Sequence, residues 1–388
     1  MEVVQYAEHF SKISETFIYD YVTELEEQGC YPSVVTHNHH NSQERPFDRV
    51  RVVDWPGRWH PARLFHRIRL RNSKKPYVAS FWPQVRSRLS PVVADIDPDV
   101  IHAQFGPMGV VMSPVARSLD IPLVVHFHGY DVSFLLPDAF WEEQYDALFD
   151  SASGLIGVSN HICEKLRQLG APEEKIRLLH GGIRLAKFDY DPPTPRFDGK
   201  TVQCLHVGRL VEKKAPLDLI RAFSEAHQRA GDDVDLHLTI AGDGPMREDV
   251  EDLIAELGLS NHVQCLGNVS HERVVELMQE SHLYTQHCKT ASNGDQEGQG
   301  ITFVEASATG LPIVTTRHNG IPDVVNDEET GLLVREGDVE AMGKKIAYLA
   351  LHPEEWSSFS EAGRRRVKEK FDLTKQTRKL ISIYEDVA

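Results

Sequence analysis

Short apolar runs alternate with helical patterns along most of the chain, and this alternation constrains the fold more than any other feature. Apolar runs of this length are typical of strands that are buried on both faces, and such strands separated by helices form βαβ units on a parallel sheet. We therefore predict an α/β fold built from parallel sheets. The expected strands are residues 122–127, 154–158, 176–179, 202–207, 236–241, 262–266, 283–286, 312–315 and 331–334, with helical stretches such as 216–230 and 245–257 between them.

A proline-rich segment divides this pattern into two parts. Residues 189–200 read D-Y-D-P-P-T-P-R-F-D-G-K, and three prolines within four residues make a stiff, extended connector. With 388 residues, the chain is also longer than one hydrophobic core usually serves. We predict a Rossmann-like N-terminal domain of residues 1–190 and a Rossmann-like C-terminal domain of residues 200–371, which face a central cleft. We expect a last helix at 372–388 to pack back on the first domain.

The composition excludes several classes of protein. Hydrophobic residues make up 41% of the chain and charged residues 26%, as in soluble globular proteins, and 26 glycines and 21 prolines are too few for a collagen-like chain. No apolar run is long enough for a spanning helix, and the N-terminus lacks the basic and apolar regions of a secretory signal. Five scattered cysteines without a C-x-x-C pair indicate free thiols in a reducing compartment. We therefore expect a cytoplasmic protein.

The charge is negative overall but unevenly distributed. A net charge of −16 argues against nucleic-acid binding, because a polyanion would be repelled. No Asp or Glu occurs from Trp55 to Ala94, whereas nine Lys and Arg residues lie within 58–88 among several aromatic residues. Such a patch suits an anionic membrane surface or a diphosphate-bearing partner. We expect residues 58–88 to form either a peripheral membrane contact or a solvated helix and loop.

Two glutamates flank the start of an expected helix in the segment Q-E-G-Q-G-I-T-F-V-E-A-S-A-T-G-L-P-I-V-T-T, residues 296–316. Glu297 and Glu305 are eight residues apart, and the helix is expected over 301–309. The glycines before it allow a ligand to approach the backbone at a helix N-terminus, where N–H groups favour a phosphate. One carboxylate would then meet a sugar hydroxyl and the other a ribose diol. A surface glutamate and an ordinary helical glutamate form the competing interpretation.

Two cations follow another expected strand, in L-H-V-G-R-L-V-E-K-K-A-P-L-D-L-I, residues 205–220. Gly208 permits a sharp turn at the strand end, and Arg209 and Lys214 follow on the loop. An arginine fork and a lysine point charge at the exit of a buried strand can neutralise a diphosphate. Exposed loop charges without a ligand are the alternative, and Lys213 is the competing lysine.

The turn A-G-D-G-P at residues 241–245 connects a strand to a helix that begins near a proline. It lacks the full G-x-G-x-x-G pattern, so it does not indicate a dinucleotide site. We expect Gly242 to shape the scaffold, with donor contact as a second role. G-x-S-x-G and P-loop patterns are absent, which disfavours the common serine hydrolases and NTPases.

Two histidines end an expected strand in V-V-H-F-H-G-Y-D-V-S, residues 124–133. We expect His126 and His128 to point to opposite faces of the sheet, which would oppose a shared metal ion. His128, beside a glycine, is expected to face the ligand, and a fully hydrogen-bonded core histidine is the competing interpretation. The histidine-rich run T-H-N-H-H-N at 36–41 lacks Cys or carboxylates at ligand spacing, and we expect it to be a loop.

Together these segments resemble the retaining glycosyltransferases of the GT-B fold, and sequence family four in particular. The E-x7-E element of that family matches residues 297–305, and its G-R-L-V-x-K-K-G stretch matches 208–215, with Ala215 in place of the last glycine. The blocks at 157–170, 181–183, 241–245 and 309–314 also fit. The motifs S-E-T-F-I at 14–18 and H-A-Q-F-G at 102–106 resemble a branch that builds bacterial exopolysaccharides such as colanic acid and amylovoran.

The resemblance implies roles for individual residues. Arg209 and Lys214 would bind the donor diphosphate, and Glu297 would contact hydroxyls of the transferred sugar. Glu305 would hold the nucleotide ribose, and His128 would approach the transferred sugar. Further donor-binding positions are Gly208, Gly242, Gly298, Gln299, Gly300, Ile301 and, in the loop after the first strand, Ser14. The segment 288–295 is longer than the usual loop of the family.

The implied reaction moves a sugar from a UDP- or GDP-sugar to a hydroxyl of a glycan or a lipid-linked acceptor and keeps the anomeric configuration. Charge develops as the diphosphate leaves, and fixed cations and a helix N-terminus would stabilise that charge. We expect no metal ion and no cofactor, because these cations neutralise the diphosphate and no D-x-D cluster stands in the expected place. Alternatives are a nucleotide-sugar epimerase of the same fold and a non-catalytic nucleotide-sugar-binding protein; a dehydrogenase is disfavoured by the missing dinucleotide fingerprint.

Overall fold

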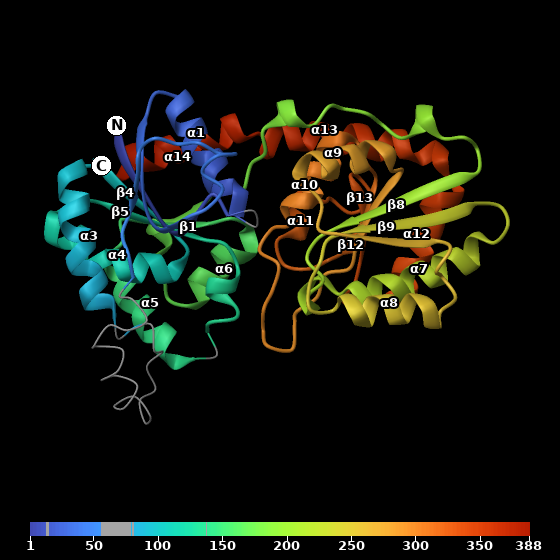
Figure 1. The fold of residues 1–388 in the computed structure, drawn as a ribbon, viewed down its shortest axis with the longest axis horizontal. Coiled ribbons are helices and arrows are strands. Elements are labelled where there is room, and N and C mark those ends of the chain that lie inside the picture. The colour runs from blue at the N-terminus through green and yellow to red at the C-terminus, as the bar shows by residue number, and fades with distance from the viewer. Residues whose placement is uncertain (13–14, 56–78, 80, 137) are drawn as a thin grey trace. The chain divides into compact units, whose positions relative to one another are not determined.

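Two parallel β-sheets form the cores of two structural units in a computed structural model of the chain (Figure 1). The structure describes residues 1–12, 15–55, 79, 81–136 and 138–388. The first unit contains Met1–Gly181 together with Leu373–Ala388, and the second contains Gly182–Asp372. The predicted α/β class with two Rossmann-like halves is confirmed. The proline-rich segment 189–200 lies inside the second unit, since the division comes at Gly181.

A seven-stranded sheet forms the core of the first unit. Its strand order is β3-β2-β1-β4-β5-β6-β7, and all neighbouring strands run parallel. The strands are β1 (Glu2–Phe10), β2 (Tyr31–His39), β3 (Val50–Val52), β4 (Val100–Gln104), β5 (Leu123–Phe127), β6 (Gly154–Gly157) and β7 (Ile176–Leu178). The helices are α1 (Thr16–Glu27), α3 (Trp82–Ile96), α4 (Gly106–Leu119), α5 (Ala139–Ser151), α6 (Asn160–Gln168) and α14 (Leu373–Val387).

A six-stranded parallel sheet forms the core of the second unit, in the order β10-β9-β8-β11-β12-β13. Its six strands agree with the predicted ones to within about two residues. They are β8 (Thr201–Val207), β9 (Asp235–Ala241), β10 (Val263–Gly267), β11 (Leu283–Gln286), β12 (Ile313–Thr316) and β13 (Gly331–Val334). The helices are α7 (Pro216–Ala230), α8 (Arg247–Glu256), α9 (His271–Glu280), α10 (Ile301–Thr309), α11 (Ile321–Val324), α12 (Val339–Leu351) and α13 (Trp356–Lys370).

The expectation of a loop at 36–41 is wrong for residues 36–39, which are the end of β2, whereas residues 40 and 41 lie outside any strand or helix. Here the strand carries polar side chains that find partners inside the protein. The ring of His37 is buried and bonds the Tyr6 hydroxyl through Nε2 (2.7 Å) and the Val53 carbonyl through Nδ1 (2.5 Å). A buried histidine with both nitrogens bonded is compatible with a strand, although its polarity suggests a loop.

The C-terminal helix α14 packs into the first unit. Leu380, Ile383 and Tyr384 are buried in one cluster with Val3 of β1 and Val124 of β5. The Tyr384 hydroxyl also accepts a hydrogen bond from the side chain of Gln5 (2.8 Å) and bonds His102 Nδ1 at 2.6 Å. The last helix in the sequence therefore completes the core that begins with the first strand.

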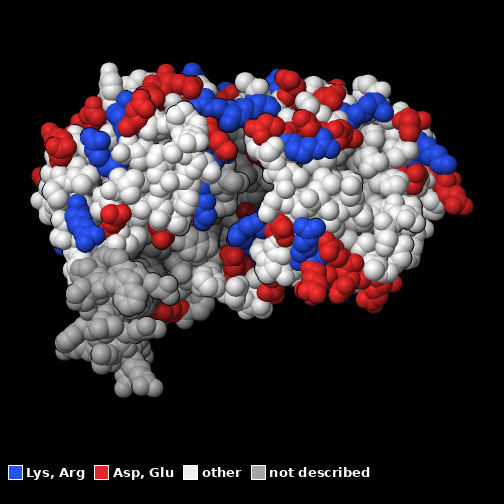
Figure 2. Space-filling view, in the orientation of Figure 1, with Lys and Arg blue, Asp and Glu red and all other residues white. Residues whose placement is uncertain are grey.

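Most of the basic stretch 58–88 lies outside the described residues, because the structure does not describe 56–78 and 80. Within the described part, Arg86 donates hydrogen bonds to the carbonyls of Val110 and Val111 (2.9 and 3.1 Å), so it joins α3 to α4. In Figure 2, acidic and basic side chains lie interspersed over the described part of the face in view.

No helix of the described residues is both long and apolar enough to cross a membrane. The five cysteines are free, as expected.

Replacing Leu380 by Ala should destabilise the first unit. The side chain is fully buried, and removing a buried leucine side chain costs about 2–5 kcal/mol through lost burial and a cavity. Lys379→Ala, one residue earlier on an exposed position of α14, should change the free energy of unfolding by less than about 0.5 kcal/mol. Urea unfolding followed by tryptophan fluorescence measures both. Equal stabilities for the two variants would contradict the packing of α14 as a core helix.

Candidate functional site

Each sheet reverses its strand order once, and the candidate residues follow strands that lie at this reversal or one strand away from it. In the second unit the reversal lies between β8 and β11, and in the first unit between β1 and β4. Open parallel sheets bind ligands outside the carboxyl ends of the strands at such a point. Arg209 and Lys214 follow β8, Glu297 follows β11, and His128 directly follows β5, the strand next to β4.

A buried ion pair joins the loops after β8 and β11. Lys214 Nζ lies 2.7 Å from Glu297 Oε2, and the two side chains are only 11% and 16% exposed. The loop after β11 is also fastened by Lys213, whose Nζ contacts Asp295 Oδ1 at 3.1 Å and the Gln296 carbonyl at 3.2 Å. The two neighbouring lysines therefore have separate partners, and Lys214 is the one that pairs with the first glutamate of the E-x7-E element.

The ion pair keeps both groups charged despite their burial. Burial raises the pKa of the Glu297 carboxyl, but the ammonium groups of Lys214 and Lys213 outweigh burial and lower the pKa to about 2. Burial likewise lowers the pKa of Lys214, but the carboxylate of Glu297 outweighs burial and the net pKa is raised. At neutral pH the site therefore contains a carboxylate that accepts hydrogen bonds and an ammonium that donates them.

Two residues that the sequence did not single out hold this pair in place. Gln286, at the end of β11, accepts a hydrogen bond from Lys214 Nζ (3.1 Å) when its amide is oriented to satisfy both of its ends. The backbone N–H of Glu297 donates to His318 Nε2 (3.1 Å). His318 Nδ1 must then carry the proton, and it donates to Glu336 at 2.6 Å. Their only signal in the sequence is a polar residue at or just after the end of a strand.

Within the described part of the chain, Lys214 has two hydrogen-bond partners, which leaves one N–H available for a ligand. An ammonium has three N–H groups, and Glu297 and Gln286 account for two of them. Arg209 is exposed, and its guanidinium makes no hydrogen bond or ion pair with the residues that the structure describes. The charge of Arg209 does lower the pKa of Lys214, so the two cations act on the same region. This region can therefore accept an anion from solvent.

The start of helix α10 adds backbone donors to the same loop. Gly300 caps the helix with φ 83°, and a Cβ at this position would lie 2.5 Å from the ring of Phe303. Only glycine fits there, and the helix then begins at Ile301 with N–H groups that lack an intrahelical partner. Gly298 and Gln299 are buried before the helix, and Glu305 is buried one turn into it. The whole element follows directly on Glu297.

Glycine at position 242 has a packing role. Its φ is 149°, and a Cβ there would lie 1.9 Å from the carbonyl oxygen of Gly208. The backbones of the loops after β8 and β9 therefore touch, and the Gly208 N–H donates to the Ala241 carbonyl (3.0 Å). Ala215, where the family usually has glycine, adopts φ 42°, which costs roughly 1–2 kcal/mol for an L-residue. This left-handed turn leads from Lys214 into α7.

In the first unit, His128 lies in an aromatic surrounding. Its ring centroid is 4.6 Å from those of Phe17 and Phe105, and 4.4 Å from that of His126, on which it stacks. The expectation that the two histidines point to opposite faces is wrong, because residues two apart on a strand point to the same face. Burial lowers the pKa of His128 well below its usual value, and the charges of neighbouring histidines lower it further. The ring is therefore neutral.

Hydrogen bonds fix both the ring and the backbone of His128. Its Nε2 lies 2.9 Å from Gln104 Oε1, so Nε2 carries the proton and Nδ1 is left as an acceptor. The carboxylate of Asp131 accepts the N–H groups of Gly106, His128 and Gly129 at 2.8–3.2 Å. Burial raises the pKa of Asp131 to about 6, although these N–H groups oppose the rise.

Ser14, the donor contact predicted in the loop after the first strand, lies outside the described residues.

Comparison with family models covers both halves of the chain. Residues 14–187 match the model described as Glycosyltransferase Family 4, and residues 188–366 match the model described as Glycosyl transferases group 1. The division between the two models falls close to the division between the two units.

Curated relatives of similar length match about three quarters of the chain. The putative colanic acid biosynthesis glycosyltransferase WcaL of Escherichia coli is 28% identical over 291 residues, which cover 74% of this chain and 70% of the relative. The amylovoran biosynthesis glycosyltransferase AmsK of Erwinia amylovora is 28% identical and covers 75% and 70%. A GDP-mannose-dependent mannosyltransferase of phosphatidylinositol monomannoside from Mycolicibacterium smegmatis is 28% identical and covers 73% and 75%.

Solved structures share the fold over the full length. The Anabaena protein Alr3699/HepE, crystallised with UDP, has a TM-score of 0.77 at 16% identity and covers 99% of each chain. The sucrose-phosphate synthase of Thermosynechococcus elongatus has a TM-score of 0.77 at 18% identity and covers 100% of this chain and 98% of the other. With its N-terminal half matched by the family-four model and its C-terminal half by the group 1 model, the chain belongs to the family-four glycosyltransferases and has the GT-B fold.

Proposed function

We propose that this protein is a retaining glycosyltransferase that moves a sugar from a UDP- or GDP-sugar to a hydroxyl of a glycan or lipid-linked acceptor. The reaction would serve the synthesis of exopolysaccharide or another cell-surface glycan, in the cytoplasm at the inner face of the membrane. The main support for the proposal is the buried pair of Lys214 and Glu297 at the strand-order reversal of the second sheet, together with Arg209, which has no partner within the described ranges. The names of two relatives, for colanic acid and amylovoran synthesis, support a glycan product. A relative named as GDP-mannose-dependent and a solved structure crystallised with UDP support a nucleotide-sugar donor.

The main barrier of this reaction is charge separation, because positive charge builds on the sugar as the diphosphate leaves. Arg209 and the remaining N–H of Lys214 would stabilise the leaving diphosphate, together with the N–H groups at the start of α10. These cations would neutralise the charge of the diphosphate, which a metal ion does in other enzymes, so we propose a metal-independent reaction without a cofactor. The bond from the anomeric carbon to the diphosphate oxygen breaks, the acceptor oxygen bonds that carbon from the same face, and its proton passes to the diphosphate.

The carboxylates would bind the donor rather than attack it. Glu297 stays ionised with its charge balanced by Lys214, which suits the acceptance of hydrogen bonds from sugar hydroxyls. Glu305 would hold the ribose diol from the second turn of α10. His128 would accept a hydrogen bond from a hydroxyl of the transferred sugar at Nδ1, because its Nε2 already donates to Gln104. Gly208, Gly242 and residues 298–301 would shape the donor site through their backbone, and Ser14 would add a contact.

Incubation with donors tests the function directly. UDP, GDP, UDP-glucose and GDP-mannose are screened by thermal shift, because a ligand of the folded state raises the melting temperature by mass action. For a donor that binds, slow hydrolysis without acceptor should release the sugar first in the anomeric configuration of the donor, as followed by proton NMR, also in the presence of EDTA. A changed donor sugar still linked to its nucleotide would indicate an epimerase instead. Binding without any turnover would indicate a non-catalytic protein.

Replacing Arg209 by Ala should lower turnover on the order of 10²- to 10³-fold, as expected for the loss of one preorganised electrostatic contact. Because Arg209 has no partner among the described residues, the melting temperature of the Arg209→Ala variant should stay close to that of the wild type. Arg221→Ala is the matched control. Arg221 is 49% exposed on α7, and its guanidinium makes a long ion pair of 3.6 Å with Asp218. Unchanged turnover of Arg209→Ala would contradict the mechanism. Lys214 is less suitable, because its removal leaves Glu297 buried without its cation, which costs about 3–5 kcal/mol.

The proposed membrane contact of residues 58–88 has its own test. Each basic residue near an anionic surface contributes about 1 kcal/mol, so changing Arg67, Arg69 and Arg71 to Gln should weaken binding about a hundredfold. Co-sedimentation with vesicles containing phosphatidylserine measures the binding, and phosphatidylcholine vesicles serve as the neutral control. Equal binding to both vesicle types would contradict an electrostatic contact.

A further inference from the structure

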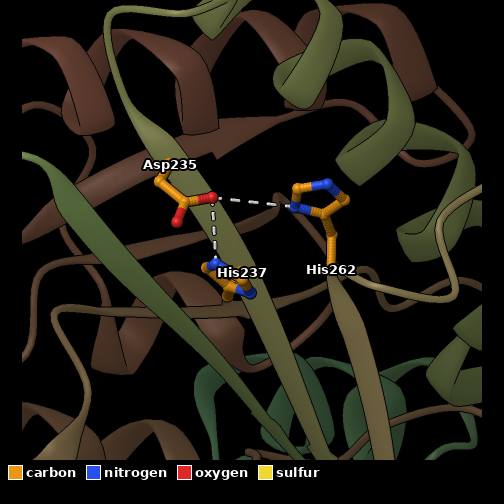
Figure 3. A group of neighbouring side chains, drawn as sticks. All are labelled: Asp235, His237 and His262. Atoms are coloured by element: carbon orange, nitrogen blue, oxygen red, sulfur yellow. Dashed lines mark ion pairs between the residues drawn. The ribbon is translucent and has the colours of Figure 1, made fainter.

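Three metal-ligating side chains meet at the amino ends of β9 and β10, the end of the sheet opposite the candidate donor site. They are Asp235, His237 and His262 (Figure 3). Among the residues that the structure describes, they form the one group of at least three His, Cys, Asp or Glu with one ligand atom from each within 4.8 Å of the others. The proposed function makes no use of them.

The sheet itself brings the three side chains together. Asp235 and His237 are two residues apart on β9, so their side chains point to the same face. His262 comes directly before β10, and its carbonyl accepts the N–H of Leu238 at 2.8 Å. Since Val263 pairs with Leu238 in parallel register, His262 lies beside His237. Two adjacent strands therefore supply all three ligands from rigid backbone.

The distances are close to those of a zinc site. Asp235 Oδ1 lies 3.0 Å from His237 Nε2 and 3.8 Å from His262 Nδ1 (Figure 3). Tetrahedral zinc with bonds of about 2.0–2.1 Å separates its ligand atoms by about 3.3–3.4 Å. These two distances lie on either side of this value, and the ligand atoms of His237 and His262 lie within 4.8 Å of each other, so side-chain rotations would bring the three atoms to the spacing of a zinc site.

An unsatisfied buried nitrogen points to a missing ligand. His262 Nδ1 is buried and has no hydrogen-bond partner among the described residues, and its 3.8 Å from Asp235 is too long for a hydrogen bond. The ring of His227, from the last turn of α7, packs against that of His262 with centroids 4.2 Å apart and limits its rotation. Buried polar atoms are rarely left unpaired, and a bound cation would satisfy this one.

We propose that Asp235, His237 and His262 bind one divalent transition-metal ion, for which zinc is the best fit, with water in the fourth position. Two imidazoles and one carboxylate are typical zinc ligands, whereas calcium and magnesium require mostly oxygen ligands. β10 is an edge strand of the sheet, so the ion would fasten this edge to its neighbour. Asp235 and Ala241, the two ends of β9, are six residue steps apart, about 20 Å at 3.3 Å per residue, so the ion lies far from the donor side and its role is structural rather than catalytic.

Zinc binding by the untagged full chain tests the proposal. After EDTA treatment and its removal, isothermal titration with zinc chloride should give one site, and zinc should raise the melting temperature. His237→Ala and His262→Ala should each weaken binding by more than about tenfold, since even outer-shell changes cost about 10- to 100-fold. Both side chains are partly exposed, so the metal-free variants should melt close to the metal-free wild type.

A matched control separates this site from binding at other histidines. His352→Ala removes a partly exposed histidine of the same unit, which pairs with Glu354 at 2.9 Å, and should leave zinc binding unchanged. Cobalt in place of zinc should give the visible absorption of a tetrahedral site in the wild type and in His352→Ala but not in His262→Ala. Absence of one-site binding in the wild type would overturn the proposal. Unchanged binding in His237→Ala and His262→Ala would do so as well, because the metal would then bind elsewhere.

Discussion

The candidate site of the second unit depends on the burial of two opposite charges at one place. Lys214 and Glu297 come from loops that follow neighbouring strands, and neither charge would be stable there alone. A buried ion pair repays its desolvation only with close geometry and further hydrogen bonds, and here Gln286 and the His318–Glu336 pair supply them. The result is a site in which the charge of Lys214 is balanced and its ammonium is held in place by Glu297 and Gln286.

Close backbone packing gives this charged pair a rigid base. The carbonyl of Gly208 lies where a side chain at position 242 would have to be, and Gly300 occupies a place next to Phe303 that admits no Cβ. These contacts fix the loops after β8 and β9 and the first turn of α10. Preorganised dipoles and charges stabilise a transition state because they need no rearrangement during the reaction. The glycine turns therefore contribute by holding the charged groups and the helix N-terminus in fixed positions.

The first unit uses burial in a different way, to keep a histidine neutral. His128 is surrounded by two phenylalanines and a second histidine, and Gln104 determines which of its nitrogens carries the proton. The same network continues through Gln5 to Tyr384 of the last helix. A neutral imidazole with a fixed tautomer offers one hydrogen-bond acceptor, Nδ1, and carries no charge. The second unit thus holds a buried pair of opposite charges, and the first unit holds an uncharged polar side chain.

Local sequence determined the α/β class, the strands and helices of the second unit, and the glutamates and cations at strand ends, because short-range periodicity and turn residues carry these features. It failed for the histidine run at 36–41, where polarity suggested a loop and buried partners instead stabilise a strand. Only the tertiary structure decided which lysine pairs with Glu297 and that His318 supports it, since the partners come from different strands. The approach of His262 to Asp235 is likewise a product of strand order, which brings distant segments together in a way that no local pattern records.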